Sequence, residues 1–154
     1  MAYDKDNLIS KLNDLLTLNY DAEKGFIEAG NHVNQKDLVQ WFNANATTRR
    51  NFQHELKAHI IALGGEPSEG TSFTGELHRI WMDWKTYLPG SKTTDMFDEC
   101  LRGENKALED YQEIMNEVNT PVATSAMLNK QVGEINNNIK SLKTLEKMFV
   151  PAGA

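Results

Sequence analysis

The sequence predicts an all-α protein folded as a four-helix bundle. Apolar residues recur every third or fourth position over four stretches of about 25 residues, which is the spacing of one buried helix face. No stretch alternates polar and apolar residues as a half-buried strand does. One long connection separates the second stretch from the third, and that connection decides the topology.

The first two predicted helices span residues 5–30 and 35–63. Asp6 and Asn34 stand where their side chains could cap the first turns. Gly64-Gly65 followed by Pro67 predicts a sharp end to the second helix, because glycine accepts the left-handed cap and proline cannot continue a helix. The short turn between these helices makes them antiparallel neighbours.

The last two predicted helices span residues 95–118 and 121–149, and Thr120 before Pro121 is a typical helix start. A crossover helix is expected over residues 74–88, and its length of about 22 Å would let it run along the bundle. The second and third long helices would then be parallel, in the up-down-down-up order of ferritin-like bundles. A plain up-and-down bundle is the alternative.

Composition indicates one soluble domain over residues 1–154. The formal net charge of −6 argues against nucleic acid or an anionic membrane as a partner. No apolar run approaches the roughly 18 residues of a membrane span, and no signal peptide is recognisable. The single cysteine, Cys100, excludes a disulfide framework and suits a reducing cytoplasm.

Several strings of the sequence resemble a bacterial family of small ferritin-like four-helix-bundle proteins catalogued as a domain of unknown function. The resemblance covers nearly the whole chain and includes LNDLL, NYDAEKGF, HELKAHIIALGGEP, LHRIWMDWK and DECLRGENKALEDY. The matching positions are Asp21, Arg49, Glu55, Gly64-Gly65-Glu66-Pro67, His78-Arg79, Trp81-Met82-Asp83 and Arg102-Gly103-Glu104. The resemblance implies a ferritin-like bundle and leaves function open, because a fold does not carry a function.

Glu104 interrupts the apolar face of the third long helix at its centre. The residues that define this face are Phe97, Leu101, Leu108, Tyr111 and Met115. A buried isolated charge costs several kcal/mol, so Glu104 needs a cation, a metal ion or a proton.

Arg49 lies in the middle of the buried face of the second helix, and residue counts from the turns place it near the level of Glu104, Asn19 and Gln131. A guanidinium can bind a carboxylate through two charge-assisted hydrogen bonds. We therefore expect a buried polar cluster of these four residues. The alternative is a solvent-exposed ion pair between helices that pack loosely at this level.

A di-iron carboxylate centre in this fold needs a glutamate from each of two helices and Glu-x-x-His from each of the other two. Glu55 is followed by Ala58, and Glu134 by Asn137, so both histidines are missing at the required spacing. We expect no cofactor. The alternative is iron or manganese bound by Glu23, Glu104 and Glu134. The sequence assigns no role to His54, His59 and His78.

The predicted crossover helix carries more aromatic surface than one bundle face can cover. This surface consists of Trp81, Met82, Trp84 and Tyr87. Such a surface more often covers a core than binds a partner, but it leads us to expect a homodimer, since two-fold contacts are the commonest solution. A monomer is the alternative.

Three functions remain open. We favour a non-catalytic bundle with a structural or stress-associated role, in which a buried Arg–Glu–amide cluster replaces a metal layer. The second is a ferritin-like metal-binding or di-iron oxidase-type protein. The third is a partner-binding or assembly module that uses the crossover helix. The sequence names no small-molecule ligand.

Overall fold

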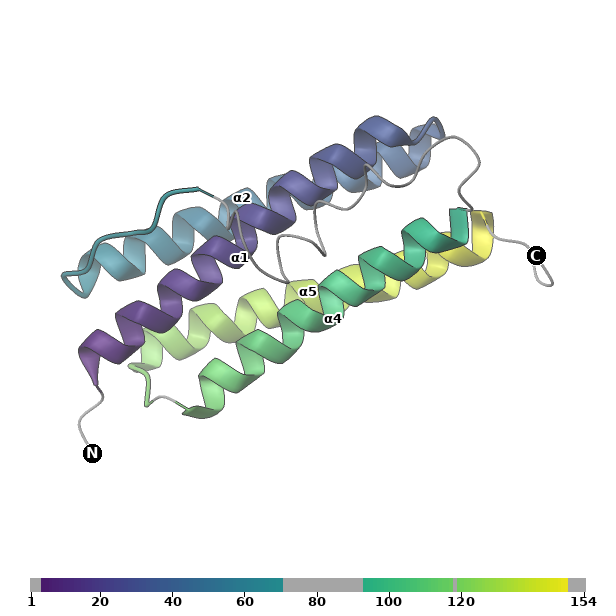
Figure 1. The fold of residues 1–154 in the computed structure, drawn as a ribbon. Helices are drawn as coiled ribbons and strands as arrows, with labels where there is room; N and C mark the ends of the chain where they lie inside the picture. The colour runs from purple at the N-terminus through teal and green to yellow at the C-terminus, as the bar shows by residue number, and fades with distance from the viewer. Residues whose placement is uncertain (1–3, 71–92, 118, 150–154) are drawn as a thin grey trace.

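A computed structural model describes residues 4–70, 93–117 and 119–149, and these residues form four α-helices and no strand (Figure 1). The helices are α1 (Lys5–His32), α2 (Lys36–Ala62), α4 (Thr93–Glu117) and α5 (Val122–Phe149). Each helix begins and ends within two residues of its predicted bounds. The predicted crossover helix at 74–88 lies outside the described residues.

The order of the helices in space is up-down-down-up. In Figure 1, α1 and α5 run from left to right, whereas α2 and α4 run from right to left. The helices α2 and α4 are therefore parallel, and the predicted ferritin-like topology is confirmed. None of the helices in the described ranges is long and apolar enough to cross a membrane.

Local side chains fix the ends of α1 and α2. The cap of α1 is Asp4, not Asp6 as expected, because the Asp4 carboxylate accepts a hydrogen bond from the amide of Asn7 at 3.1 Å. The cap position of α2 is Gln35, one residue after the expected Asn34, and its side chain makes no capping bond.

The end of α2 follows the prediction. Gly64 adopts a left-handed φ of 86° and donates its amide to the carbonyl of Ile61. A Cβ on Gly65 would lie 2.6 Å from Cγ2 of Ile9, so this corner packs closely against the start of α1.

The apolar core has two parts, one toward each end of the bundle. Leucines of α1, with Phe52, Tyr111 and Ile135, belong to the first part. The second part contains Phe26, whose ring meets Trp41 edge-on at a centroid distance of 5.8 Å. Asn19, Arg49 and Glu104 lie between the two parts along their helices, so the middle of the bundle is a polar layer.

Candidate functional site

Arg49 and Glu104 form an ion pair in the centre of the bundle. Both side chains are 0% exposed. Nη2 of Arg49 donates to Oε1 of Glu104, and Nη1 donates to Oδ1 of Asn19 at 3.2 Å. The structure therefore brings together three of the four residues expected in the polar cluster.

Aromatic rings help to hold the guanidinium. The Cζ atom of Arg49 lies 5.8 Å from the ring centroid of Phe26 and 5.6 Å from that of Phe52. A guanidinium within about 6 Å of a ring centroid is attracted by the ring quadrupole, and the attraction is largest away from water. Arg49 is thus stabilised by one carboxylate, one amide oxygen and two rings.

Gln131 is 0% exposed and joins the polar cluster through Tyr111, without a direct hydrogen bond to Arg49. Asn19 Nδ2 donates to the hydroxyl oxygen of Tyr111 at 2.9 Å, and that hydroxyl donates to Oε1 of Gln131 at 2.5 Å. Gln131 then donates to Oε1 of Glu55 at 3.5 Å. A continuous hydrogen-bonded chain therefore links Glu104 on α4 to Glu55 near the surface of α2.

Tyr111 and Gln53 are members of this network that the sequence did not reveal. The sequence pattern shows Tyr111 only as one of the residues of the apolar face of α4. A buried tyrosine hydroxyl nevertheless needs a hydrogen-bond partner. Nε2 of Gln53 lies 3.1 Å from the carbonyl oxygen of Asn19 and 2.8 Å from Oε1 of Glu23. The sequence feature that could have identified both residues is a polar group within a helix face that is otherwise apolar.

The ion pair is not the two-bond fork expected from the sequence. Nε of Arg49 and Oε2 of Glu104 are buried and have no hydrogen-bond partner among the described residues. The same is true of Oδ1 of Asn45 and Nδ2 of Asn138. Within the described residues, the desolvation of these atoms is not fully offset, and such atoms weaken a buried pair.

Burial suppresses acid–base and nucleophilic chemistry in this layer. Burial raises the pKa of the Glu104 carboxyl, and the charge of Arg49 opposes that rise. Burial also raises the pKa of the Tyr111 hydroxyl, so this group stays neutral at physiological pH. The pKa of the Cys100 thiol lies well above its usual value because of burial and the nearby charges of Glu104 and Glu99, so no reactive thiolate forms.

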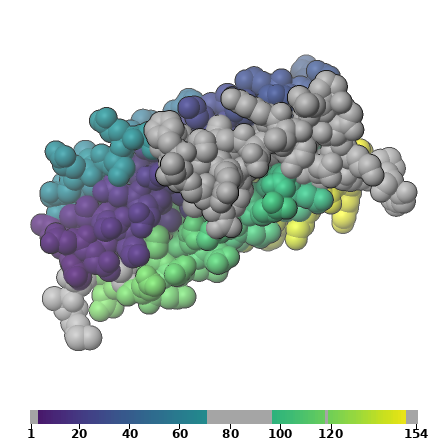
Figure 2. Space-filling model, viewed as in Figure 1, coloured from purple at the N-terminus to yellow at the C-terminus, as the bar shows by residue number. Residues whose placement is uncertain are grey.

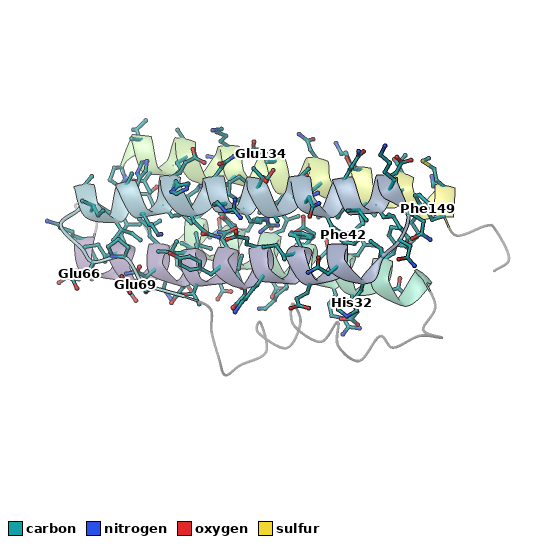
Figure 3. All side chains as sticks on the ribbon, turned by 90° about the horizontal axis from the view of Figure 1, so that it is seen from above. His32, Phe42, Glu66, Glu69, Glu134 and Phe149 are labelled. Atoms are coloured by element: carbon teal, nitrogen blue, oxygen red, sulfur yellow. The ribbon has the colours of Figure 1, made fainter. Side chains whose placement is uncertain are left out.

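The three carboxylates of the metal alternative do not share one site. Glu104 is bound to Arg49, while Glu23 accepts hydrogen bonds from Nε of Arg50 at 2.9 Å and from Gln53. Glu134 is half-buried on α5 (Figure 3). Across the described part of the chain, no three His, Cys, Asp or Glu side chains gather closely enough to hold a metal ion.

Neither described histidine of α2 belongs to the central layer. His54 is exposed, and Nδ1 of His59 lies 3.5 Å from Oγ1 of Thr124, near the C-terminal end of the helix. His78 and the expected interface residues Trp81, Met82, Trp84 and Tyr87 lie outside the described residues.

Replacing Tyr111 with Phe should lower the free energy of unfolding by about 1–3 kcal/mol, because Oε1 of Gln131 then loses its buried donor. Urea unfolding followed by circular dichroism measures the change. The control is Tyr20→Phe, since Tyr20 is only half-buried and packs its ring against Lys57. Equal losses in the two variants would contradict a special role for the Tyr111 hydroxyl.

A family model described as a domain of unknown function, DUF2383, matches residues 7–117. The chain belongs to this family. The matched region contains Asn19, Arg49 and Glu104 but ends before Gln131, so the DUF2383 match includes the ion pair and not the whole network.

The DUF2383 chain is also similar to a solved structure. The crystal structure of ferritin-like, diiron-carboxylate proteins from Bacillus anthracis str. Ames superposes with a TM-score of 0.70 and 18% sequence identity, over 94% of this chain and 99% of that one. At this identity the similarity shows the fold, which is ferritin-like. No curated protein matches the sequence.

Proposed function

We propose that this DUF2383 protein is a non-catalytic, cytoplasmic ferritin-like bundle with a structural or stress-associated role. Its central layer is an Arg–Glu–amide cluster instead of a metal centre. The observation that carries the proposal is the fully buried guanidinium of Arg49, bonded to Glu104. Arginine is always protonated in proteins, so a permanent positive charge occupies the centre of the bundle.

The residues of the layer do not fit the di-iron centre that the solved neighbour's description suggests. Such a centre needs four inward carboxylates and two histidines on the bundle's helices. Here Glu104 is engaged by a cation, and Glu23 by Arg50 and Gln53. The helices α2 and α5 have no histidine three residues after Glu55 or Glu134.

Electrostatics opposes a metal ion at the same level. Two unit charges 4 Å apart interact by about 4 kcal/mol at an effective dielectric constant of 20, so a divalent ion that close to a guanidinium is repelled by about 8 kcal/mol. A metal ion would also compete with Arg49 for Glu104. The ion pair and a metal at this carboxylate are therefore close to mutually exclusive.

Metal content tests the proposal. Protein purified without chelators, and the same protein incubated with Fe²⁺ or Mn²⁺ and then desalted, should contain well under one metal ion per chain by plasma mass spectrometry. Fe²⁺ should oxidise no faster with the protein than with buffer.

Two variants show where any metal binds. Glu104→Ala removes the central carboxylate, and Glu28→Ala removes a carboxylate from the surface side of α1. Two iron or manganese ions per chain, lost in Glu104→Ala and kept in Glu28→Ala, would replace this proposal with the oxidase-type alternative.

A further inference from the structure

The helices α4 and α5 pair antiparallel and together form one outer surface, along the lower edge of the molecule in Figures 1 and 2. We call this surface the α4–α5 face. The hydrogen bond between Tyr111 and Gln131 fixes the register of the two helices. Because the helices are antiparallel, residue numbers rise along α4 as they fall along α5 from this bond. Glu113 therefore lies opposite Asn129, and Arg102 lies opposite Lys140.

Charge is separated along this face. α4 carries eight acidic residues and two basic ones, whereas α5 carries four lysines and two glutamates. At the end formed by the C-terminal half of α4, Glu109 and Glu113 are exposed. At the other end, formed by the C-terminal half of α5, the exposed lysines are Lys140, Lys143 and Lys147. One end is therefore acidic and the other is basic.

Within the part of the chain that the structure describes, these charges form no ion pairs. Among the described residues, no ion pair involves Glu109, Glu113 or the three lysines, although six other pairs are formed. Asp98 is also exposed at the basic end, and Glu99 and Glu146 are half-buried there. Glu99 is paired with Arg102, so the exposed charge at this end stays mainly positive. Along α5, Lys143 lies about 14 residues from Asn129, the residue opposite Glu113, which is roughly 21 Å at 1.5 Å per residue. Lys143 and Glu113 of one chain are therefore too far apart to pair.

The middle of the face is uncharged and partly apolar. Leu101, Leu108 and Val132 are only partly buried in the seam between the helices. The amides Asn105 and Asn136 are exposed beside them. The face thus has an apolar and amide centre between two charged ends, which is the layout of a specific protein interface.

Gly133 adds an independent observation. It is exposed in the interior of α5, and a Cβ built on it would meet no atom within 4 Å. Glycine inside a helix costs about 1 kcal/mol relative to alanine. No contact in the described chain requires a glycine here, whereas close approach of a helix from another molecule would.

We propose that the α4–α5 face binds the same face of a second copy of this chain, with the two bundles antiparallel. The two-fold axis passes near Asn105 and Asn136. Glu109 and Glu113 of one protomer then meet the lysines of α5 in its partner, and the reverse pairing occurs at the other end. An isologous contact must be self-complementary in this way.

The charge pattern favours a second copy over other partners. A nucleic acid or an anionic membrane would be repelled by Glu109 and Glu113, since both carry negative charge along their whole length. A second copy turned end for end pairs both charged ends at once. Such complementarity selects the partner and the register more than it adds affinity.

Charge reversal tests the proposal in the full-length protein. We expect the wild type to sediment as a dimer. Glu109→Lys/Glu113→Lys makes both ends basic, and Lys140→Glu/Lys143→Glu makes both ends acidic. Each variant alone should be monomeric, with a dimer dissociation constant raised on the order of tenfold or more by like-charge contacts. An equimolar mixture of the two variants should form a heterodimer, because their ends are complementary again.

The matched control is Lys24→Glu/Lys36→Glu, which reverses two exposed lysines on α1 and α2 and should leave the dimer intact. Thermal unfolding by circular dichroism verifies that each variant is folded. A wild type that is monomeric at every concentration overturns the proposal. So does a dimer that both reversal variants keep, or a mixture that fails to associate.

Discussion

Replacing Glu104 with Gln should lower the free energy of unfolding by about 3–5 kcal/mol. The substitution keeps the shape of the side chain and removes the charge that balances the guanidinium of Arg49, which is 0% exposed. Breaking a buried pair by removing one partner leaves an uncompensated charge in a poorly solvating interior. Arginine cannot escape this cost by losing its proton.

Removing both partners should cost far less than removing Glu104 alone. In Arg49→Met/Glu104→Leu the layer becomes apolar, and buried ion pairs are often replaced this way with little loss of stability. We expect a coupling free energy of about 2 kcal/mol or more in the double-mutant cycle. Urea unfolding of metal-free protein measures the free energy of unfolding of the wild type, the two single variants and the double variant.

Glu134→Gln is the control for the cycle, because Glu134 is half-buried on α5 and is outside the network (Figure 3). It should change stability by no more than about 0.5 kcal/mol. If Glu104→Gln were neutral or stabilising in metal-free protein, Glu104 would behave as one of several carboxylates that repel one another. That result would support the metal-binding alternative.

The sequence predicted the helices and the two charges of the central layer because both depend on periodicity alone. Positions on a helix face follow from about 100° per residue, so the sequence alone places Arg49 and Glu104 inside the apolar faces of their helices. Residue counts from the turns between helices place Arg49 and Glu104 at the same level of the bundle, which predicts their contact. The topology followed from the length of one connection.

The pairing of polar atoms could not be predicted in the same way. Gln131 was expected in one cluster with Arg49 and Asn19, but the sequence could not show that the hydroxyl of Tyr111 lies between Gln131 and Asn19. Which donor reaches which acceptor depends on side-chain rotamers and on shifts of about 1 Å between helices, and sequence spacing contains neither. The caps differ from expectation for a similar reason, since Asp4 and Asp6 are both plausible caps for α1 and only local backbone geometry decides between them.

Replacing Arg49 with Met should destabilise the protein in a pH-dependent way, in contrast to Glu104→Gln. Glu104 would stay buried without its cation, and burial already raises the pKa of its carboxyl from the ordinary value of 4.5. The variant would fold with this carboxyl protonated, whereas the unfolded chain would release the proton above its ordinary pKa. The cost of the substitution should therefore be smallest near pH 4.5, where both folded proteins hold this proton, and grow once the pH exceeds the pKa of Glu104 in the wild type.

The expected slope is at most one proton, or about 1.4 kcal/mol per pH unit, until the pH exceeds the pKa of the folded variant. Urea unfolding of the variant and the wild type at several values between about pH 5 and pH 8 measures the difference. Cys100 and Tyr111 add no slope of their own there, because burial raises the pKa of both groups in the folded state. Arg49→Met/Glu104→Leu should show no such extra slope, since it lacks the carboxyl. If Arg49→Met kept the same difference from the wild type at every pH, Glu104 would not depend on Arg49 for its charge, and the ion pair could not be what occupies the centre of this bundle.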